Sequence, residues 1–265
     1  MKTLTPTPYR AATTAILLAA GLGTRLAPLT RTSPKCLTLF EGEPMLGRAI
    51  NALQRQGISH VVVVAGYLSD YVREYINRRG LSDTVEIVLN PEYARTGTAA
   101  SLQCGLTMAP VESDVLVVEA DVVFEDRVLE QVLETAGSAA AIAAYRPDLT
   151  GTFAIRNAEG VLTDWVHESQ RERDFRVVEH WKTVNITRFS SADVQQRLML
   201  ALAEVRREYG DRAPFEYAAR YGIKRLGMAL KGVDVSLCRW YEVDTMDDLE
   251  RARRIFQTAL LTTVA

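Results

Sequence analysis

The chain has few features that would tie it to an oxidising compartment, to nucleic acid or to a membrane. Its 265 residues include three cysteines, Cys36, Cys104 and Cys238, which are far apart and lack zinc-site spacing. We therefore expect reduced thiols in a cytoplasmic protein. The net charge is −2 at pH 7, whereas a surface that binds nucleic acid is usually strongly basic. No segment after the N-terminal region approaches the roughly 20 apolar residues of a transmembrane helix. We expect neither nucleic acid nor membrane as a partner.

Histidine is equally scarce, and its positions exclude familiar kinds of site. His60, His167 and His180 stand in no pattern typical of a metal centre or a catalytic triad. No serine or cysteine lies in a pattern that suggests a nucleophile. We therefore assign the histidines no role and expect no nucleophilic catalysis by serine or cysteine.

The N-terminus resembles a secretion signal at first sight. Lys2 and Arg10 precede an apolar run over 11–22. This run leads directly into a glycine-containing loop, so cleavage would destroy that loop, and we expect the run to be retained as a buried strand. We expect residues 1–10 to be a flexible tail and residues 11–265 to form one domain without linker or repeat.

The remaining pattern predicts an α/β fold. With 48% hydrophobic and 24% charged residues, the composition suits one large globular domain. Strands and helices alternate in the first half, which predicts a mostly parallel sheet flanked by helices, with ligands beyond the carboxyl ends of its strands. The expected strands are Ala15–Ala20, His60–Ala65, Thr84–Leu89, Asp114–Ala120 and Ala139–Tyr145, and the expected helices are Pro44–Gln56, Asp70–Asn77, Gly97–Met108 and Arg127–Thr135.

The second half of the chain does not continue the regular alternation of strands and helices. We expect a hairpin of Thr152–Arg156 with Val161–Val166, strands at Lys182–Phe189 and Val235–Trp240, and helices at Asp193–Tyr209, Pro214–Tyr221 and Met246 to about Leu260. Ser190 or Ser191 is expected to cap the first of these helices.

The most informative stretch lies between Leu18 and Leu37 and reads LAAGLGTRLAPLTRTSPKCL. Glycines permit positive φ and a close approach of the backbone to a ligand. Exposed N–H groups bind anions, and Arg25 and Lys35 add fixed positive charge. The spacing matches neither the P-loop nor the dinucleotide-binding pattern. The stretch predicts a loop that wraps around a polyphosphate.

The whole string resembles the signature loop of nucleotidyltransferases, which join a nucleoside triphosphate to a phosphorylated small molecule. The resemblance implies a single-domain, Rossmann-like fold of the nucleotide-diphospho-sugar transferase type. It also implies that Arg25 and the loop hold the triphosphate and that Lys35 contacts the phosphate under attack. The implied nucleotide-binding residues of the loop are Leu18, Ala19, Ala20, Gly21, Gly23 and Thr24.

Two carboxylates match the metal ligands of these families. Asp121 follows a predicted strand, where a carboxylate is a natural Mg²⁺ ligand as well as a common helix cap. The resemblance implies that Asp121 binds Mg²⁺, while Glu119 replaces an aspartate of the family pattern and its role stays open. The segment WYEVD near the C-terminus is similar to one in small cytidylyltransferases, which implies Asp244 as the second ligand.

The segment from Lys182 to Ser190, KTVNITRFS, resembles one in cytidylyltransferases of phosphonate metabolism. The resemblance implies that Lys182 meets the acceptor phosphate or phosphonate and acts in catalysis, and that Asn185 lines the acceptor pocket. Thr187 and Arg188 depart from the family pattern. Glu216 and Tyr217 fall where these enzymes place acceptor residues, although aromatic residues at such spacing are often core.

The base is expected to contact a segment of small residues. TGTAASL over 96–102 opens a predicted helix, and similar segments contact the base in nucleotidyltransferases, which implies Thr98 and Ser101. Helix capping is the alternative explanation of these hydroxyls. Gly66 resembles a second turn on the nucleotide side.

Taken together, these resemblances imply a cytidylyltransferase that transfers CMP from CTP to a small phosphonate, such as 2-aminoethyl- or 2-hydroxyethylphosphonate, and releases pyrophosphate. The acceptor oxygen is already ionised, so no general base is needed. Phosphocholine and a sugar 1-phosphate are alternative acceptors, a regulatory domain that only binds nucleotide is a further alternative, and homodimer formation is left open.

Overall fold

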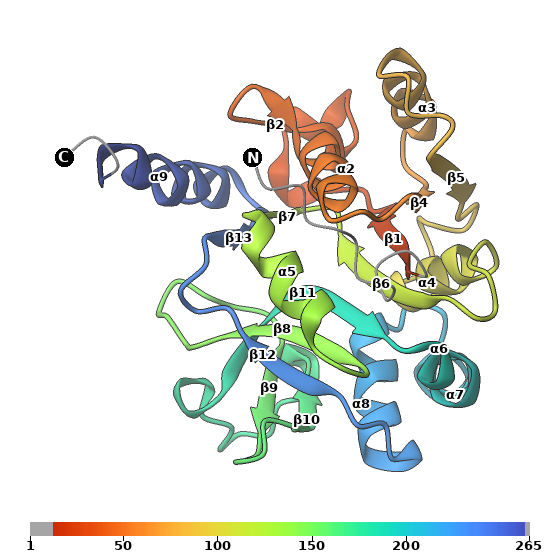
Figure 1. The fold of residues 1–265 in the computed structure, drawn as a ribbon, viewed down its shortest axis with the longest axis vertical. Coiled ribbons are helices and arrows are strands. Elements are labelled where there is room, and N and C mark those ends of the chain that lie inside the picture. Colours follow the sequence, from red (N-terminus) through yellow and green to blue (C-terminus); the bar gives the residue numbers. More distant parts are fainter. Residues whose placement is uncertain (1–12, 263–265) are drawn as a thin grey trace.

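A computed structural model describes residues 13–262, and a mixed nine-stranded sheet runs through it (Figure 1). Four of its strands lie parallel in the order β6-β1-β4-β5, with β5 at one edge of the sheet. They are β1 (Thr13–Ala19), β4 (His60–Ala65), β5 (Val85–Leu89) and β6 (Asp114–Glu119). Both faces of β1, β4 and β6 are covered, which explains their continuous apolar character, whereas β5 is partly exposed. The predicted parallel arrangement is confirmed.

The long strand β11 (Trp181–Phe189) joins this parallel unit to the rest of the sheet. It pairs antiparallel with β6 on one edge. Its other edge pairs with β8 (Ala139–Ala143) and β9 (Phe153–Arg156), where the register shifts between Thr183 and Thr187. Asn185 lies within this shift with a positive φ of 60°. Such a bulge re-aims a side chain, and here it directs Asn185 toward the end of β6.

The remaining strands extend the sheet beyond β11. The predicted hairpin is present as β9 with β10 (Leu162–Val166), and β12 (Lys231–Asp234) lies parallel to β8.

Two layers of helices cover the sheet (Figure 1). On one face α2 (Met45–Arg55), α3 (Ser69–Arg78), α5 (Asp126–Glu134) and α9 (Met246–Thr262) contribute to a single large core. On the other face α4 (Thr98–Leu106), α7 (Met199–Tyr209) and α8 (Phe215–Leu226) form a second core. A short helix α6 (Ser191–Asp193) and a π-helical turn over Val194–Leu198 lead into α7, and Ser190 caps α6 by accepting a hydrogen bond from the Asp193 amide.

One predicted strand is wrong, and short strands were missed. Residues 235–239 form a turn rather than a strand, because the Asp234 carboxylate accepts a hydrogen bond from the Ser236 amide and reverses the chain. The strand instead begins at Trp240, as β13 (Trp240–Glu242), which pairs with β7 (Val122–Phe124). β2 (Leu39–Phe40) and β3 (Glu43–Pro44) form another short pair. Strands of two or three residues carry too little periodicity to be predicted.

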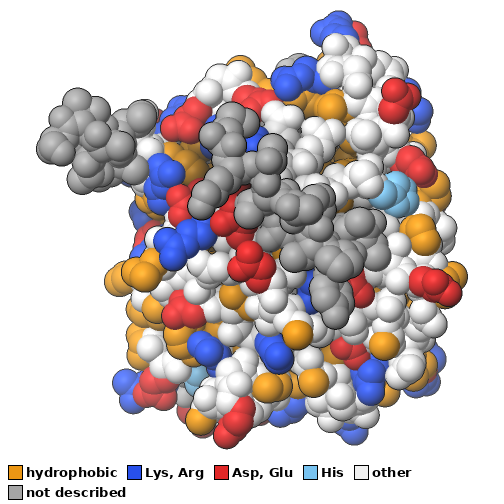
Figure 2. All heavy atoms as spheres, in the orientation of Figure 1, with side chains coloured by type: hydrophobic (Ala, Val, Ile, Leu, Met, Phe, Trp, Pro, Cys, Tyr) orange, Lys and Arg blue, Asp and Glu red, His pale blue; other side chains and the backbone are white. Residues whose placement is uncertain are grey.

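Two further expectations concern the ends and the surface. The predicted tail over 1–10 lies outside the described residues. Within 13–262 no helix is both long and apolar enough to cross a membrane. Acidic and basic side chains are interspersed on the face shown in Figure 2.

Candidate active site

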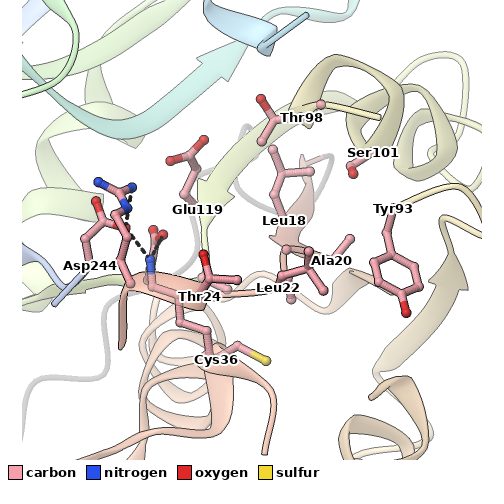
Figure 3. A pocket seen from close by; sticks show the side chains of 18 of the residues that line it. Leu18, Ala20, Leu22, Thr24, Cys36, Tyr93, Thr98, Ser101, Glu119 and Asp244 are labelled. Atoms are coloured by element: carbon pink, nitrogen blue, oxygen red, sulfur yellow. Dashed lines mark hydrogen bonds and ion pairs between the residues drawn. The ribbon is translucent and has the colours of Figure 1, made fainter. Parts of the chain in front are cut away.

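A cavity of about 360 Å³ opens at the carboxyl ends of β1 and β6 (Figure 3). The loop after β1, the first turns of α4 and the segment after β13 form its walls. Asp244 and Glu119 lie on one side, while Thr98, Ser101 and Tyr93 lie on the other (Figure 3). The structure brings twelve predicted residues to its lining, namely Leu18, Ala19, Ala20, Gly21, Gly23, Thr24, Arg25, Lys35, Thr98, Ser101, Asp121 and Asp244.

The loop after β1 is shaped by glycine and by one hydroxyl. Gly23 has φ 61°, and its carbonyl accepts a hydrogen bond of 2.9 Å from Thr30 Oγ1. A Cβ at Gly23 would lie 2.7 Å from Lys35 Cβ, so a larger residue would displace the lysine. This loop conformation therefore depends on Gly23.

Gly66, which was expected to bind nucleotide, lies behind the lining rather than in it. A Cβ there would lie 2.7 Å from the Ala20 carbonyl oxygen and 2.6 Å from Tyr93 Cβ. Gly66 thus allows the loop after β1 and the loop after β5 to lie close together. It affects the shape of the cavity without lining it.

Lys35 is the electrostatic centre of the site. Its Nζ donates hydrogen bonds to Asp121 Oδ2 at 2.6 Å and to Asp244 Oδ1 at 2.7 Å, and Arg25 Nη2 lies 2.9 Å from the same Asp244 oxygen. Burial acts to lower the pKa of Lys35, but the two carboxylates outweigh it and hold the pKa above its ordinary value. Lys35 is therefore charged throughout the physiological range.

The short β7–β13 pair holds the two aspartates together. The Val243 amide donates to the Asp121 carbonyl at 2.9 Å, which places the next residue, Asp244, beside the Asp121 side chain. Asp248 accepts hydrogen bonds from the amides of Asp244 and Thr245 and fixes the start of α9.

The pair of aspartates fits the requirements of a divalent cation. Asp121 Oδ1 is buried without a hydrogen-bond partner, which is costly for a carboxylate oxygen. Mg²⁺ is held by one or two carboxylates together with substrate phosphates, so two aspartates facing a polyphosphate loop match its ligand set. Among residues 13–262 there is no group of three or more His, Cys, Asp or Glu side chains that would hold a metal alone. A Mg²⁺ ion at these two aspartates would take its other ligand oxygens from substrate phosphates and water.

A second cluster, Lys182 with Asn185, Glu119, Glu216 and Glu242, adjoins the cavity through Glu119. Lys182 is 2% exposed, donates to the Thr183 carbonyl at 2.6 Å and lies 3.2 Å from Glu242 Oε2. Asn185 Nδ2 donates to Glu119 Oε2 at 2.9 Å. This contact gives Glu119 a partner, and the bulge in β11 is what makes it.

The three glutamates of this cluster are strongly affected by their surroundings. Burial, followed by the charges of Glu216 and Asp121, raises the pKa of Glu119 well above its usual range. Burial likewise raises the pKa of Glu216 to about 7, and Glu242 adds to the effect. The pKa of Glu242 is also raised, mainly by burial and against the opposing effect of Lys182. The cluster is short of positive charge, and Glu216 Oε2 is buried without a partner.

Tyr217 does not join this cluster. Successive side chains on a helix diverge by about 100°, so Glu216 faces the cluster while Tyr217 turns away. The Tyr217 hydroxyl lies 2.5 Å from Ser169 Oγ, and its ring packs edge-on against Tyr209. The expected contact of Tyr217 with the acceptor is not supported by this placement.

Sequence reasoning also missed residues of the site. Cys36, Tyr93 and Thr96 line the cavity, and Glu242 contacts Lys182. Glu242 lies within the WYEVD segment, two residues before Asp244, so alternation along a strand was an available signal. Nothing in the local sequence distinguishes Tyr93 or Thr96 from ordinary turn residues.

The fold and site define a nucleotidyltransferase-type domain. The chain belongs to the family described as the MobA-like NTP transferase domain, which matches residues 15–184. As a group, nucleotidyltransferases generally use divalent metal ions.

Curated relatives carry related names. The chain is 35% identical over 248 residues to a CMP-5'-(3-aminopropyl)phosphonate synthase from Streptomyces rubellomurinus, covering 93% of this chain and 39% of that protein. It is 38% identical over 156 residues to a 2-aminoethylphosphonate cytidylyltransferase from Lancefieldella rimae, covering 59% and 56%. The chain thus spans well under two thirds of the length of these relatives.

Solved structures show the same fold at low identity. A CTP:phosphocholine cytidylyltransferase from Streptococcus pneumoniae has a TM-score of 0.74 at 21% identity, covering 92% of this chain and 99% of that one. A UDP-glucose pyrophosphorylase in complex with UDP-glucose has a TM-score of 0.75 at 17% identity, covering 93% and 98%. The predicted fold of the nucleotide-diphospho-sugar transferase type is confirmed.

Proposed function

We propose that this protein transfers CMP from CTP to a small aminoalkylphosphonate and releases pyrophosphate. The observation that carries this proposal is the placement of Asp121 and Asp244 around Lys35, beneath a glycine-containing loop that lines the same cavity. Such a site suits a reaction in which two anionic molecules must be held together.

Each residue has a distinct task in this reaction. Arg25 and the loop amides hold the β- and γ-phosphates, and Lys35 stabilises the charge that develops at the α-phosphorus. Lys182 orients the phosphonate, whose oxygen attacks that phosphorus while pyrophosphate departs in line. A bound Mg²⁺, held by Asp121 and Asp244, would neutralise charge shared by the two substrates. The phosphonate oxygen is ionised at neutral pH, so the protein has no proton to remove.

The charge of the second cluster favours an acceptor with an ammonium group. Glu216 and Glu242 lie near both Lys182 and Glu119, and Glu216 Oε2 is buried without a donor. A primary ammonium has three N–H donors and would satisfy such a carboxylate. A quaternary ammonium has none, and a hydroxyl brings no charge. This argues for an aminoalkylphosphonate over phosphocholine or 2-hydroxyethylphosphonate.

The comparisons support the same choice. Of the two curated relatives described above, one is named as a synthase of CMP-5'-(3-aminopropyl)phosphonate and the other as a cytidylyltransferase of 2-aminoethylphosphonate. The likeness to the phosphocholine enzyme and to the UDP-glucose enzyme supports the fold alone, because identity is 21% and 17%.

A substrate panel tests the proposal. Pyrophosphate release is measured with CTP, UTP, ATP and GTP against 2-aminoethyl-, 3-aminopropyl- and 2-hydroxyethylphosphonate, phosphocholine and glucose 1-phosphate. We expect release with CTP and an aminoalkylphosphonate, and formation of the CMP conjugate by mass spectrometry. Activity with a sugar phosphate alone would overturn the proposal. Nucleotide binding without turnover on any acceptor would instead indicate a regulatory domain.

A matched pair of variants tests the acceptor assignment. Lys182→Met should raise the KM for the acceptor with little effect on the KM for CTP, because Lys182 lies in the glutamate cluster and not in the cavity lining. Lys224→Met removes a half-exposed lysine that pairs with Asp164 and should leave both values unchanged. Equal effects on the two KM values in Lys182→Met would contradict the assignment.

A further inference from the structure

Asn90 connects the end of β5 to the wall of the cavity on which the base is expected to lie. It follows β5 directly, its amide donates to the Ala65 carbonyl at 2.9 Å, and it is 3% exposed. Its side chain contacts Ser101, which lines the cavity and is 5% exposed. Asn90 itself does not line the cavity, so it can act on a ligand only through its neighbours.

The orientation of the Asn90 amide is determined by the backbone. Its Oδ1 accepts a hydrogen bond of 3.0 Å from the amide of Glu92, and a backbone N–H can only donate. The Nδ2 group must therefore face the other way. There it donates to Thr96 Oγ1 at 2.9 Å and to Ser101 Oγ at 3.0 Å.

This arrangement determines which way each hydroxyl donates. Thr96 Oγ1 accepts from Asn90 and passes its own hydrogen to the Glu92 carbonyl at 3.0 Å. Ser101 Oγ also accepts from Asn90, but within residues 13–262 no acceptor receives its hydrogen. Because Ser101 lines the cavity, its hydroxyl is left to donate to whatever occupies that wall.

We propose that Asn90 sets the polarity of Ser101 so that its hydroxyl donates to N3 of cytosine, which makes Asn90 a positioning residue for selection of CTP over UTP. The inference rests on the proposed function only in taking a pyrimidine triphosphate as ligand. N3 carries a lone pair in cytosine and an N–H group in uracil. N3 of cytosine accepts the hydrogen of the Ser101 hydroxyl, whereas the N–H of uracil can bond only to the remaining lone pair of Oγ and leaves that hydrogen without an acceptor, which a buried site penalises.

The first test measures binding, so it does not depend on turnover. Calorimetry with Mg²⁺ compares CTP, UTP and 3-deazacytidine triphosphate, in which C–H replaces N3. We expect wild type to bind CTP roughly tenfold or more tightly than either analogue. Ser101→Ala should lose most of the difference between CTP and the 3-deaza analogue. Equal binding of these two by wild type would overturn the proposal.

The second test changes the polarity itself. In Asn90→Asp at pH 8.5 the carboxylate can only accept, so Ser101 must donate to it and present a lone pair to the base. The ratio of CTP to UTP affinity should fall roughly tenfold or more. Asn90→Leu should lower the ratio less, because the hydroxyl is then unconstrained. Asn157→Asp changes an exposed asparagine whose Oδ1 likewise accepts from a backbone amide, and it should leave the ratio unchanged.

The outcomes separate this inference from the proposed function. Weaker binding of both nucleotides in the Asn90 variants, with an unchanged ratio, would mean that Asn90 only supports the loop, and would overturn the inference. If wild type selects CTP but transfers CMP to no acceptor, the inference stands and the proposed function fails. If wild type transfers CMP and UMP equally well, nucleotidyl transfer stands and the inference fails.

Discussion

The carboxylates of Asp121 and Asp244 are bound to the same atom, Lys35 Nζ, at 2.6 and 2.7 Å. Neither position is near the other in sequence, and the three-residue pair β7–β13 is what joins them. The backbone bond from Val243 to Asp121 makes this register specific. A site built in this way is held by the sheet, so substitutions of its side chains should affect chemistry more than folding.

Removing either aspartate charge should therefore reduce turnover without unfolding the protein. Asp121→Asn and Asp244→Asn should each lower kcat/KM by about 10³-fold, because several kcal/mol of charge stabilisation are lost. The thermal midpoint should change by only a few degrees. The measurement is pyrophosphate release together with calorimetric unfolding. Asp126→Asn, which breaks an exposed pair with Arg55, serves as the control. Near-normal turnover in Asp121→Asn would remove this residue from the site.

Lys35→Met should make stability sensitive to magnesium. Without the ammonium, Asp121 and Asp244 repel each other across the position that Lys35 Nζ occupies, so the free energy of unfolding should fall. Added Mg²⁺ should restore more stability to this variant than it gives to wild type, because a ligand that binds the folded state stabilises it. Thermal unfolding with and without Mg²⁺ checks this. An identical response in both proteins would argue against a cation between these carboxylates.

Glu216→Gln should stabilise the protein at alkaline pH. Burial raises the pKa of Glu216 to about 7 in the folded state, so the unfolded chain ionises first as pH rises. Wild type then loses stability between about pH 4.5 and 7, and the cost persists above pH 7. The variant avoids this loss and should gain about 2–3 kcal/mol relative to wild type between pH 5 and 8.5.

Urea unfolding at the two pH values measures the difference. Burial is the main cause of the raised pKa of Glu216; Glu242 and Asp121 add to it, and Lys182 opposes it. Glu74→Gln breaks an exposed pair with Arg78 and should give no comparable change. A gain that is equal at both pH values would contradict the assignment of Glu216.

Two glycines near the cavity should behave differently when replaced by alanine. Gly66→Ala places a methyl group 2.7 Å from the Ala20 carbonyl and against Tyr93, so both stability and nucleotide affinity should fall. Gly21→Ala meets no protein atom within 4 Å and should fold normally. Because Gly21 lines the cavity, the variant should still bind CTP more weakly. Thermal unfolding and calorimetry distinguish these cases, and normal CTP binding by Gly21→Ala would place the phosphates elsewhere.

Much of the fold followed from local patterns. Residues 61–65 form an unbroken apolar run, and the apolar residues of 45–55 recur at helical spacing. These patterns predicted β4 and α2 almost at their observed bounds. The turn at 235–239 was misread because Val235 and Leu237 suggest a strand, while the side chain of Asp234 reverses the chain. At this position one side-chain hydrogen bond outweighed the strand propensity of the local sequence.

The candidate site divides in the same way. Its composition, meaning the glycines, Arg25, Lys35 and two aspartates, could be read from the chain. The burial of Lys182 among glutamates could not, because it depends on the register shift in β11 and on the packing of α8. The placement of Tyr217 could not be predicted either, because adjacent residues of a helix point in different directions and only the packing of α8 shows which of them, Glu216 or Tyr217, faces the cluster.

The amino-acid order alone thus determined an α/β domain with a phosphate-binding loop after its first strand, since glycine freedom and apolar periodicity are properties of short segments. Only the tertiary structure decided that Asp121 meets Asp244 and that Asn90 orients Ser101. Those contacts join segments whose separation in the chain is closed by the geometry of the whole sheet, and no local pattern encodes that geometry.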